Sequence, residues 1–208
     1  MPKYDVIVIG SGPGGYVAAL RSAELGLKTA CIEKEKAVGG TCLNVGCIPS
    51  KALLQSTSYY ALLQKEIKEH GILFNDLKID FLKMMQRKQG IIEGLVKGIL
   101  GAFKQEKVDH IQGLASFIDP HKILVVNGGD RKELEADYFI LATGSEAIPL
   151  PFLPFDEKHI LSSTGALSLQ SIPKKMIVIG AGIIGVELAS VYNRLGTEVI
   201  IIEMLDQI

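Results

Sequence analysis

The sequence predicts an α/β fold in which one strand, turn, helix and strand unit occurs twice. Apolar runs that lead directly into closely spaced glycines begin both units, at residues 6–9 and 176–179. Between them lie two long stretches, 49–70 and 80–106, that are poor in proline and have helical composition. Short buried strands that alternate with helices favour a largely parallel sheet.

The first unit opens with a strand at residues 5–9, and small and apolar residues at 16–24 then follow a helical pattern. Gly26 ends that helix, and residues 28–33 supply a second strand. The length of this strand, helix and strand segment fits a crossover connection between two parallel strands. We therefore expect a Rossmann-like domain at the start of the chain.

The middle of the chain is expected to add a helical pair and a small antiparallel layer. Residues 49–70 and 80–106 are predicted to form two antiparallel helices. Four short stretches of β-type residues follow and are expected to form the antiparallel layer, with Asp-Pro and Gly-Gly turns between them: 108–112, 115–118, 122–126 and 132–136. A further buried strand is expected at 138–142, directly before Thr143.

A proline-rich stretch at 149–154 predicts a domain boundary near residue 150. Residues 1–150 would form the first domain and 151–208 the start of a second Rossmann-like domain. In the latter we expect a strand at 176–179, a helix at 184–195 and a strand at 198–203. The second domain is expected to be incomplete.

Composition, charge and the distribution of apolar residues argue against several classes of function. The chain has 208 residues, is 48% hydrophobic, and has a net charge of −1 with a pI of about 6.4, which gives no basic footprint for nucleic acid. No apolar run approaches the roughly 18 residues of a membrane span. The N-terminus shows no export signal, so a cytoplasmic location is expected. The four histidines lack metal-ligand spacing, so no metal site is predicted.

Two glycine motifs predict two dinucleotide sites. Gly10, Gly12 and Gly15 follow the first strand in GxGxxG spacing. Gly180, Gly182 and Gly185 repeat that spacing after the second opening strand. Such glycines permit a tight turn, close approach of a pyrophosphate and close helix packing.

An acidic residue follows each motif at the position that binds a ribose. Glu33 and Glu203 both lie 23 positions after the first glycine of their motif. A carboxylate there favours NAD over NADP, because it would repel a 2′-phosphate.

Cys42 and Cys47 form the most informative pair of residues. Fully extended, their separation would be roughly 16 Å, whereas a disulfide needs Cα atoms within about 7 Å, so bridging requires a bend such as Gly46 allows. A following helix would place Cys47 at its N-terminal end, where a thiolate is stabilised, with Lys51 on the same face. Unlinked thiols or a fixed disulfide remain alternatives at this point, and Cys31 is expected to be a buried, inert thiol.

The segment GGTCLNVGCIPSK resembles the signature of the flavin- and nicotinamide-dependent disulfide oxidoreductases. Its Leu43 and Ser50 variant is most similar to the dihydrolipoamide dehydrogenase branch. The resemblance covers essentially the whole chain, including YDVIVIGSGPGGYVAA, ATGS, SSTGALSL and IGAGIIGVELAS.

The resemblance implies that the first site holds FAD and the second NAD. The implied FAD contacts are Gly10, Gly12, Pro13, Gly14, Gly15, Glu33, Lys34, Gly40, Thr41, Cys42, Lys51, Ala115, Thr143, Gly144 and Ser145. The implied NAD contacts are Gly180, Gly182, Ile183, Ile184, Gly185, Glu187 and Glu203.

The resemblance also implies catalytic roles for four residues. Cys42 would exchange with substrate sulfurs and Cys47 would lie against the flavin as a thiolate. Lys51, paired with Glu187, would lie near the reactive edge of the flavin.

The implied reaction is oxidation of dihydrolipoamide, carried on a protein or acyltransferase core, with NAD⁺ as the final acceptor. The family's C-terminal domain, which forms the homodimer and supplies a catalytic histidine, is expected to be absent from these 208 residues. The chain alone is therefore expected to be inactive. Alternatives are a related glutathione-type or mercuric reductase, and a non-catalytic FAD-binding module.

Overall fold

A computed structural model describes residues 2–65 and 67–206 and divides the chain into two compact units. The first unit comprises Met1–Asn44 and Ile92–Glu146, and the second comprises Val45–Ile91 and Ala147–Ile208. The elements are β1 (Lys3–Ile9), α1 (Pro13–Glu24), β2 (Thr29–Glu33), α2 (Gly40–Val45), α3 (Cys47–Lys65), η1 (Ile67–His70), α4 (Phe81–Gln105), β3 (Asp109–Gln112), β4 (Leu114–Asp119), β5 (Lys122–Asn127), β6 (Asp130–Leu141), α5 (Ser163–Ala166), β7 (Lys175–Ile179), α6 (Ile183–Arg194) and β8 (Glu198–Ile202).

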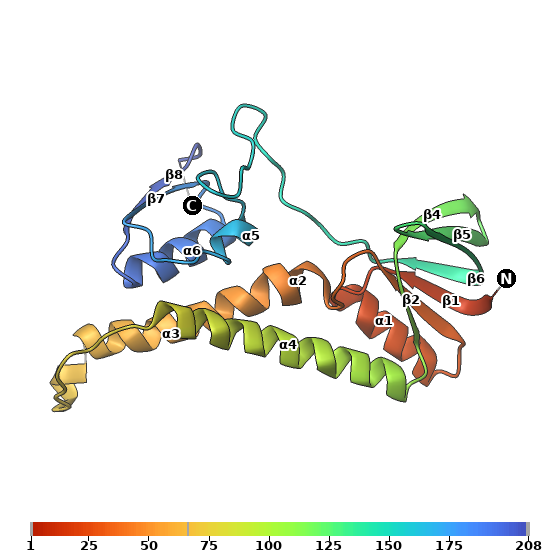
Figure 1. Cartoon of the computed structure of the whole chain (residues 1–208), viewed down its shortest axis with the longest axis horizontal. Coiled ribbons are helices and arrows are strands. Elements are labelled where there is room, and N and C mark those ends of the chain that lie inside the picture. Colours follow the sequence, from red (N-terminus) through yellow and green to blue (C-terminus); the bar gives the residue numbers. More distant parts are fainter. Residues whose placement is uncertain (1, 66, 207–208) are drawn as a thin grey trace. The chain divides into compact units, whose positions relative to one another are not determined.

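The first unit is built on a sheet with the strand order β3-β2-β1-β6-β5-β4 (Figure 1). β3, β2, β1 and β6 pair in parallel, whereas β4, β5 and β6 pair antiparallel. The sheet curls, so that apolar side chains of the parallel strands meet those of β5 and β6. This core consists of Tyr4, Ile7, Ala30, Ile32, Ile123, Val125, Leu134 and Ala136. The predicted α/β class is confirmed.

β6 joins the parallel and antiparallel parts of this sheet. Its first half pairs with β5, from Asp130 to Glu135, and its second half pairs with β1, from Glu135 to Leu141. The prediction of separate strands at 132–136 and 138–142 was therefore wrong. Asp137, which lies between the two predicted stretches, stays in the strand, and its carboxylate forms an ion pair with Lys3 Nζ at 3.1 Å.

β3 corrects a second expectation. Residues 108–112 were assigned to the antiparallel layer, but β3 pairs in parallel with β2, with Cys31 opposite His110. The helical connection that follows β2 returns the chain to the amino edge of the sheet, so the next strand runs in the same direction. The antiparallel layer accordingly consists of β4, β5 and the first half of β6.

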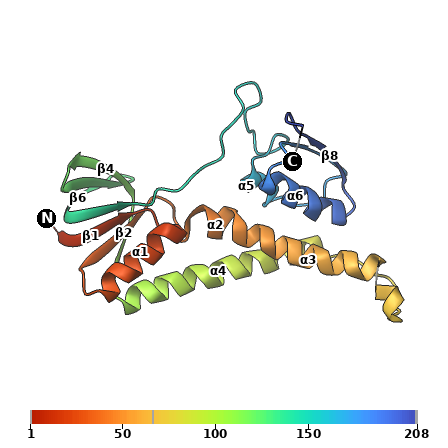
Figure 2. The same ribbon diagram turned by 180° about the vertical axis from the view of Figure 1, so that it is seen from behind.

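The second unit packs helices α3, α5 and α6 and the start of α4 around one apolar core. Its buried members are Leu53, Phe81, Met84, Ala166, Leu167, Leu188, Val191, Tyr192 and Leu195. The start of α4 runs antiparallel beside α3 (Figures 1 and 2), and Arg87 donates to the Ala52 carbonyl at 3.3 Å. β7 and β8 form a parallel pair on which α6 rests.

Two buried donors hold the short α5 turn in this core. Lys88 Nζ donates to the Leu167 carbonyl at 2.6 Å, and the Tyr192 hydroxyl donates to the Ala166 carbonyl. Burial lowers the pKa of Lys88 and raises that of Tyr192 to about 12. The bond from Lys88 joins the start of α4 to residues 147–208 within the second unit. The domain division near residue 150 remains a prediction.

Across residues 2–65 and 67–206, none of the helices combines the length and the apolar content that a bilayer crossing requires.

A glycine pair provides the first test of this fold. A Cβ on Gly15 would overlap the Gly10 carbonyl oxygen, whereas a Cβ on Gly14 would meet no atom within 4 Å. We expect Gly15→Ala to destabilise the first unit by about 3 kcal/mol, because backbone cannot yield as a side chain can. Gly14→Ala should be neutral or slightly stabilising. Urea unfolding followed by circular dichroism measures both, and equal stability of the two variants would contradict the packing described.

Candidate dinucleotide and disulfide site

The first glycine turn brings three segments of backbone together. Gly10 has a φ of 101° and donates from its N–H to the Ile32 carbonyl at 2.8 Å. A Cβ on Gly10 would overlap the Ala142 carbonyl oxygen, and a Cβ on Gly40 would lie 2.5 Å from Gly12 Cα. The turn, the end of β6 and the start of α2 are therefore in direct backbone contact.

The start of α1 is open to an anion. Gly12 is the N-cap and has no side-chain capping bond, and Pro13 occupies the first turn. The N–H groups of a helix start carry a partial positive charge and bind phosphates. A Cβ built on Gly12 would have no neighbouring atom closer than 3.8 Å, so the backbone of Gly12 is accessible. This arrangement fits the pyrophosphate of a dinucleotide.

Glu33 lies at the end of β2 and is 5% exposed. Its Oε2 accepts from the Ser11 N–H at 2.9 Å and from Ser11 Oγ at 2.5 Å, and Oε1 accepts from the Glu35 N–H at 2.9 Å. Burial alone would raise the pKa of this carboxyl, but the bonds from Glu35 and Ser11 outweigh it, so the pKa is lowered. Glu33 is thus an ionised acceptor fixed beside the glycine turn.

Ser11 is a site residue that the sequence interpretation missed. It is fully buried, and besides binding Glu33 it accepts the Gly39 N–H on its carbonyl oxygen at 2.9 Å. It thereby connects the glycine turn to the loop before α2. Its place between the first two glycines was the available signal.

The other residues implied as FAD contacts occupy different positions around this turn. Thr41 Oγ1 donates to the Ser145 carbonyl at 3.1 Å, which joins the start of α2 to the segment after β6. Thr143, Gly144 and Lys34 are exposed. Ala115 lies on β4 opposite Val125, and the Gly113 N–H that precedes it donates to the Glu33 carbonyl at 2.8 Å. The structure therefore gathers the candidates of this unit at the carboxyl ends of β1, β2 and β6.

The second glycine turn repeats this geometry within its own unit. The Gly180 N–H donates to the Ile202 carbonyl at 2.8 Å, and a Cβ on Gly185 would lie 2.6 Å from the Gly180 carbonyl oxygen. Gly182 caps α6 without a side-chain bond, and Ile183 and Ile184 are exposed in its first turn.

Glu203 occupies the same place beside its turn as Glu33 does in the first unit. Its Oε2 accepts from the Ala181 N–H at 2.7 Å. Bonds from Leu205, Ala181 and Met204 lower its pKa. The chain therefore contains two turns of one construction, each with an ionised carboxylate.

Lys51 and Glu187 form an ion pair within the second unit. Lys51 Nζ contacts Glu187 Oε1, although the two residues lie 136 positions apart in the sequence. The buried Ser50 adds a contact from its Oγ to Glu187 Oε2 at 3.3 Å. Both oxygens of this carboxylate are thus held by the first turn of α3, and Ser50 is a second contact that sequence reasoning did not identify.

The three cysteines differ in exposure. Cys31 is buried in β2, with Sγ 3.7 Å from the Gly10 carbonyl oxygen, and burial followed by the charge of Glu33 raises its pKa to about 12. Cys42 is half-buried in α2, and Cys47 is exposed as the first residue of α3. Cys31 is therefore held as an unreactive thiol, while the pairing of Cys42 with Cys47 remains a prediction.

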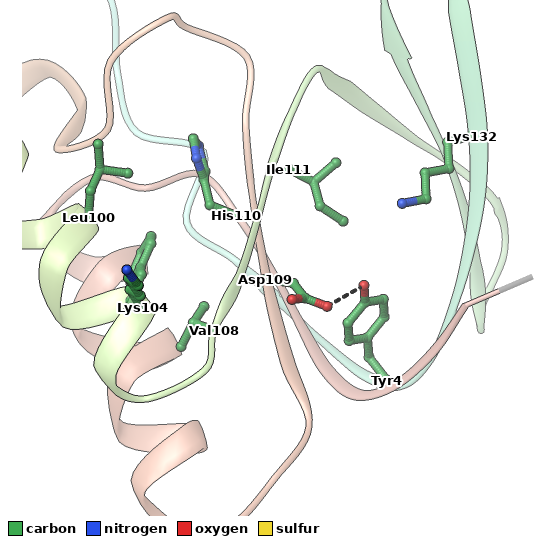
Figure 3. A pocket seen from close by; sticks show the side chains of 9 residues that line it. Tyr4, Leu100, Lys104, Val108, Asp109, His110, Ile111 and Lys132 are labelled. Atoms are coloured by element: carbon green, nitrogen blue, oxygen red, sulfur yellow. Dashed lines mark hydrogen bonds between the residues drawn. The ribbon is translucent and has the colours of Figure 1, made fainter.

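A pocket of the first unit is lined by none of the dinucleotide or cysteine candidates, although its His110 pairs with Cys31 between β3 and β2 (Figure 3). At its base the Tyr4 hydroxyl donates to Asp109 at 2.9 Å, and burial together with this bond raises the pKa of Tyr4 to about 12. Tyr4 lies at the amino end of β1, so about 20 Å of strand separates it from Gly10. The pocket is not part of the glycine turn. It is lined by Tyr4, Leu100, Phe103, Lys104, Val108, Asp109, His110, Ile111 and Lys132.

The described part of the chain, residues 2–65 and 67–206, contains no group of His, Cys, Asp and Glu side chains that could hold a metal ion.

Two glycine turns, each with an adjacent carboxylate, and a CxxxxC segment between them are the features on which the comparison with known families rests. The profile of pyridine nucleotide-disulphide oxidoreductases matches residues 4–208. The chain belongs to this family.

Curated relatives of high similarity include several dihydrolipoyl dehydrogenases. That of Trypanosoma brucei brucei is 53% identical over 203 residues, covering 96% of this chain and 42% of the relative. The mitochondrial enzyme of Schizosaccharomyces pombe is 50% identical, covering 98% of this chain and 40% of the relative. A leghemoglobin reductase of Vigna unguiculata is 49% identical, covering 98% and 39%. The chain thus spans about 40% of the length of these relatives.

A solved structure confirms the family at the level of the fold. The HOCl-induced flavoprotein disulfide reductase RclA from Escherichia coli, as a Cu(II) complex, superimposes with a TM-score of 0.85 at 30% identity. The match covers 99% of this chain and 43% of that one.

The ionised state of Glu33 gives a pH prediction. Because its pKa is lowered on folding, its contribution to stability is present above the ordinary carboxyl pKa of about 4.3 and is lost as pH falls through the folded value. We expect Glu33→Gln to lower the free energy of unfolding by about 1–2 kcal/mol at pH 7. In this variant the free energy of unfolding should also fall less steeply as the pH is lowered. Urea unfolding between pH 7 and pH 3 measures this. The exposed Glu35→Gln, which keeps the backbone donor, is the control, and an acid decline unchanged by Glu33→Gln would contradict the assignment.

Proposed function

We propose that this chain is the flavin- and disulfide-bearing part of a dihydrolipoyl dehydrogenase. The observation that carries the proposal is identity of about 50% with dihydrolipoyl dehydrogenases across both glycine turns and the cysteine segment. The geometry of the turns supports it, because each offers an uncapped helix start and an adjacent carboxylate. The first turn would hold FAD and the second NAD.

The proposed chemistry begins at the cysteine pair. A thiolate of the substrate dithiol attacks the sulfur of Cys42, the bond between Cys42 and Cys47 breaks, and Cys47 leaves as a thiolate. The second substrate thiol, as thiolate, then attacks the substrate sulfur of the mixed disulfide and releases Cys42. The substrate becomes a cyclic disulfide, and two electrons enter the cysteine pair.

Residues of this chain favour that exchange in two ways. Cys47 is the first residue of the 19-residue helix α3, and a helix N-terminus stabilises a thiolate leaving group. Cys31 is kept out of the exchange by its burial and raised pKa. When bound, FAD would accept the two electrons from the cysteine pair and NAD⁺ would be the final acceptor.

The substrate and partners follow from the relatives as part of the same proposal. Dihydrolipoamide would be presented on a carrier protein or acyltransferase core of a 2-oxo acid dehydrogenase complex, and the whole protein would act as a homodimer. The similarity to RclA and to a leghemoglobin reductase favours one alternative of the same class, in which the electrons reach a different acceptor.

The reaction of the cysteines tests the proposal directly. We expect dihydrolipoamide to convert the oxidised chain to a form with two additional thiols, mapped by mass spectrometry to Cys42 and Cys47. Glutathione, a monothiol of comparable reactivity, should react far more slowly, because it cannot resolve the mixed disulfide within one molecule. Cys31→Ala is the matched control and should behave like the unchanged chain.

Two results would refute the proposal: a disulfide that joins Cys31 to either of the other cysteines, or equal reduction by both thiols.

A further inference from the structure

Ser50 lies between the first turn of α3, which contains Cys47, and helix α6, which begins at the second glycine motif. Its Oγ lies 3.1 Å from the Cys47 carbonyl oxygen and 3.3 Å from Glu187 Oε2. Cys47 is in the same first turn of α3, whereas Glu187 belongs to α6. One buried hydroxyl therefore contacts both the backbone of the cysteine residue and a carboxylate of the opposite helix.

The contact to Glu187 is reinforced by the neighbouring residue. Lys51 Nζ contacts the other oxygen of the same carboxylate. A carboxylate contacted at both oxygens is restrained in its rotation, and its negative charge at the start of α3 favours the helical state of that turn. The side chain of Glu187 is 21% exposed and that of Lys51 is 58% exposed, so water competes for the bond to Lys51 more than for the bond to the buried Ser50.

We propose that Ser50 is a positioning residue for Cys47, which it holds in a formed helical turn by linking that turn to Glu187 of α6. The inference rests on the proposed function, because it assumes that the thiolate of Cys47 takes part in the exchange. Cys47 is exposed, so its access to reagents does not limit its reactivity. A formed helical turn offers its N-terminal N–H groups to the sulfur of its first residue, and such groups stabilise negative charge on sulfur.

The same helix offers a matched control. Ser58 Oγ donates to the Gln55 carbonyl at 2.8 Å, so it makes the same bond to the residue three positions earlier. Replacing Ser58 removes a hydroxyl of the same kind from α3 without touching Glu187. Ser50→Thr supplies the conservative variant, because it keeps the hydroxyl.

The first measurement is the rate of iodoacetamide alkylation of Cys47 in the reduced chain at pH 7, resolved by peptide mass mapping. We expect Ser50→Ala to slow this rate roughly three- to tenfold, because the loosened turn stabilises the thiolate less. Ser50→Thr should restore it, and Ser58→Ala should leave it unchanged. An unchanged rate in Ser50→Ala, or equal slowing in Ser58→Ala, would overturn the positioning role.

The second measurement tests the link itself by a double-mutant cycle of Ser50→Ala and Glu187→Gln in urea unfolding. Hydrogen bonds to charged groups predict a coupling of roughly tenfold in the folded-to-unfolded ratio, against none for Ser58→Ala with Glu187→Gln. Absence of coupling would refute the inference even if dihydrolipoamide reduces the cysteine pair. If instead coupling is found and dihydrolipoamide fails to reduce the pair, the proposed function fails while the link stands.

Discussion

The fold of the first unit depends on a contact between backbones at the end of β1. Gly10, Gly15 and Ala142 approach so closely that a Cβ on either glycine would overlap a carbonyl oxygen. This contact brings the N-terminus of α1 onto the carboxyl edge of the sheet, where β1, β2 and β6 all end. The uncapped N–H groups of α1 and the carboxylate of Glu33 meet there as a result.

The second unit reproduces this construction with different side chains. Gly180 and Gly185 repeat the close approach, and Glu203 accepts the N–H of Ala181 as Glu33 accepts that of Ser11. Because alanine has no hydroxyl, the shared element is the backbone donor after the first glycine. The hydroxyl of Ser11 is an addition in the first unit, where it supports a buried carboxylate.

Much of this arrangement could be predicted from the sequence, because strands, glycine turns and acidic partners follow local spacing. The strands β1 and β7, which open the two units of the repeat, and the helices α1 and α6 that follow them were predicted within a few residues of their observed bounds. The direction of β3 and the continuity of β6 could not be predicted, because pairing partners are distant in sequence. A polar residue such as Asp137 is compatible with a turn or with a strand, and here the pairing of β6 with β1 on both sides of it places it in a strand.

The residues of the candidate site likewise divide into those that local sequence spacing predicted and those that it did not. Spacing alone predicted the glycines, Glu33 and Glu203 as candidates, whereas the redox role of the cysteine pair was expected through the family resemblance. The proximity of Lys51 and Glu187, 136 positions apart, was expected only through the family resemblance. Ser11 and Ser50 were missed as contacts, since a serine in a glycine-rich turn or a helix start has many local roles and its partner is set by tertiary structure.

The most direct test of two distinct dinucleotide turns is calorimetric titration of FAD into the chain and into Gly12→Ala and Gly182→Ala variants. At both positions an added methyl has no protein neighbour closer than 3.8 Å, so folding should be preserved while the backbone surface offered to a pyrophosphate is covered. The account predicts one FAD per chain, binding lost in Gly12→Ala, and binding retained in Gly182→Ala. Binding that survives Gly12→Ala, or that is lost equally in both variants, would contradict it.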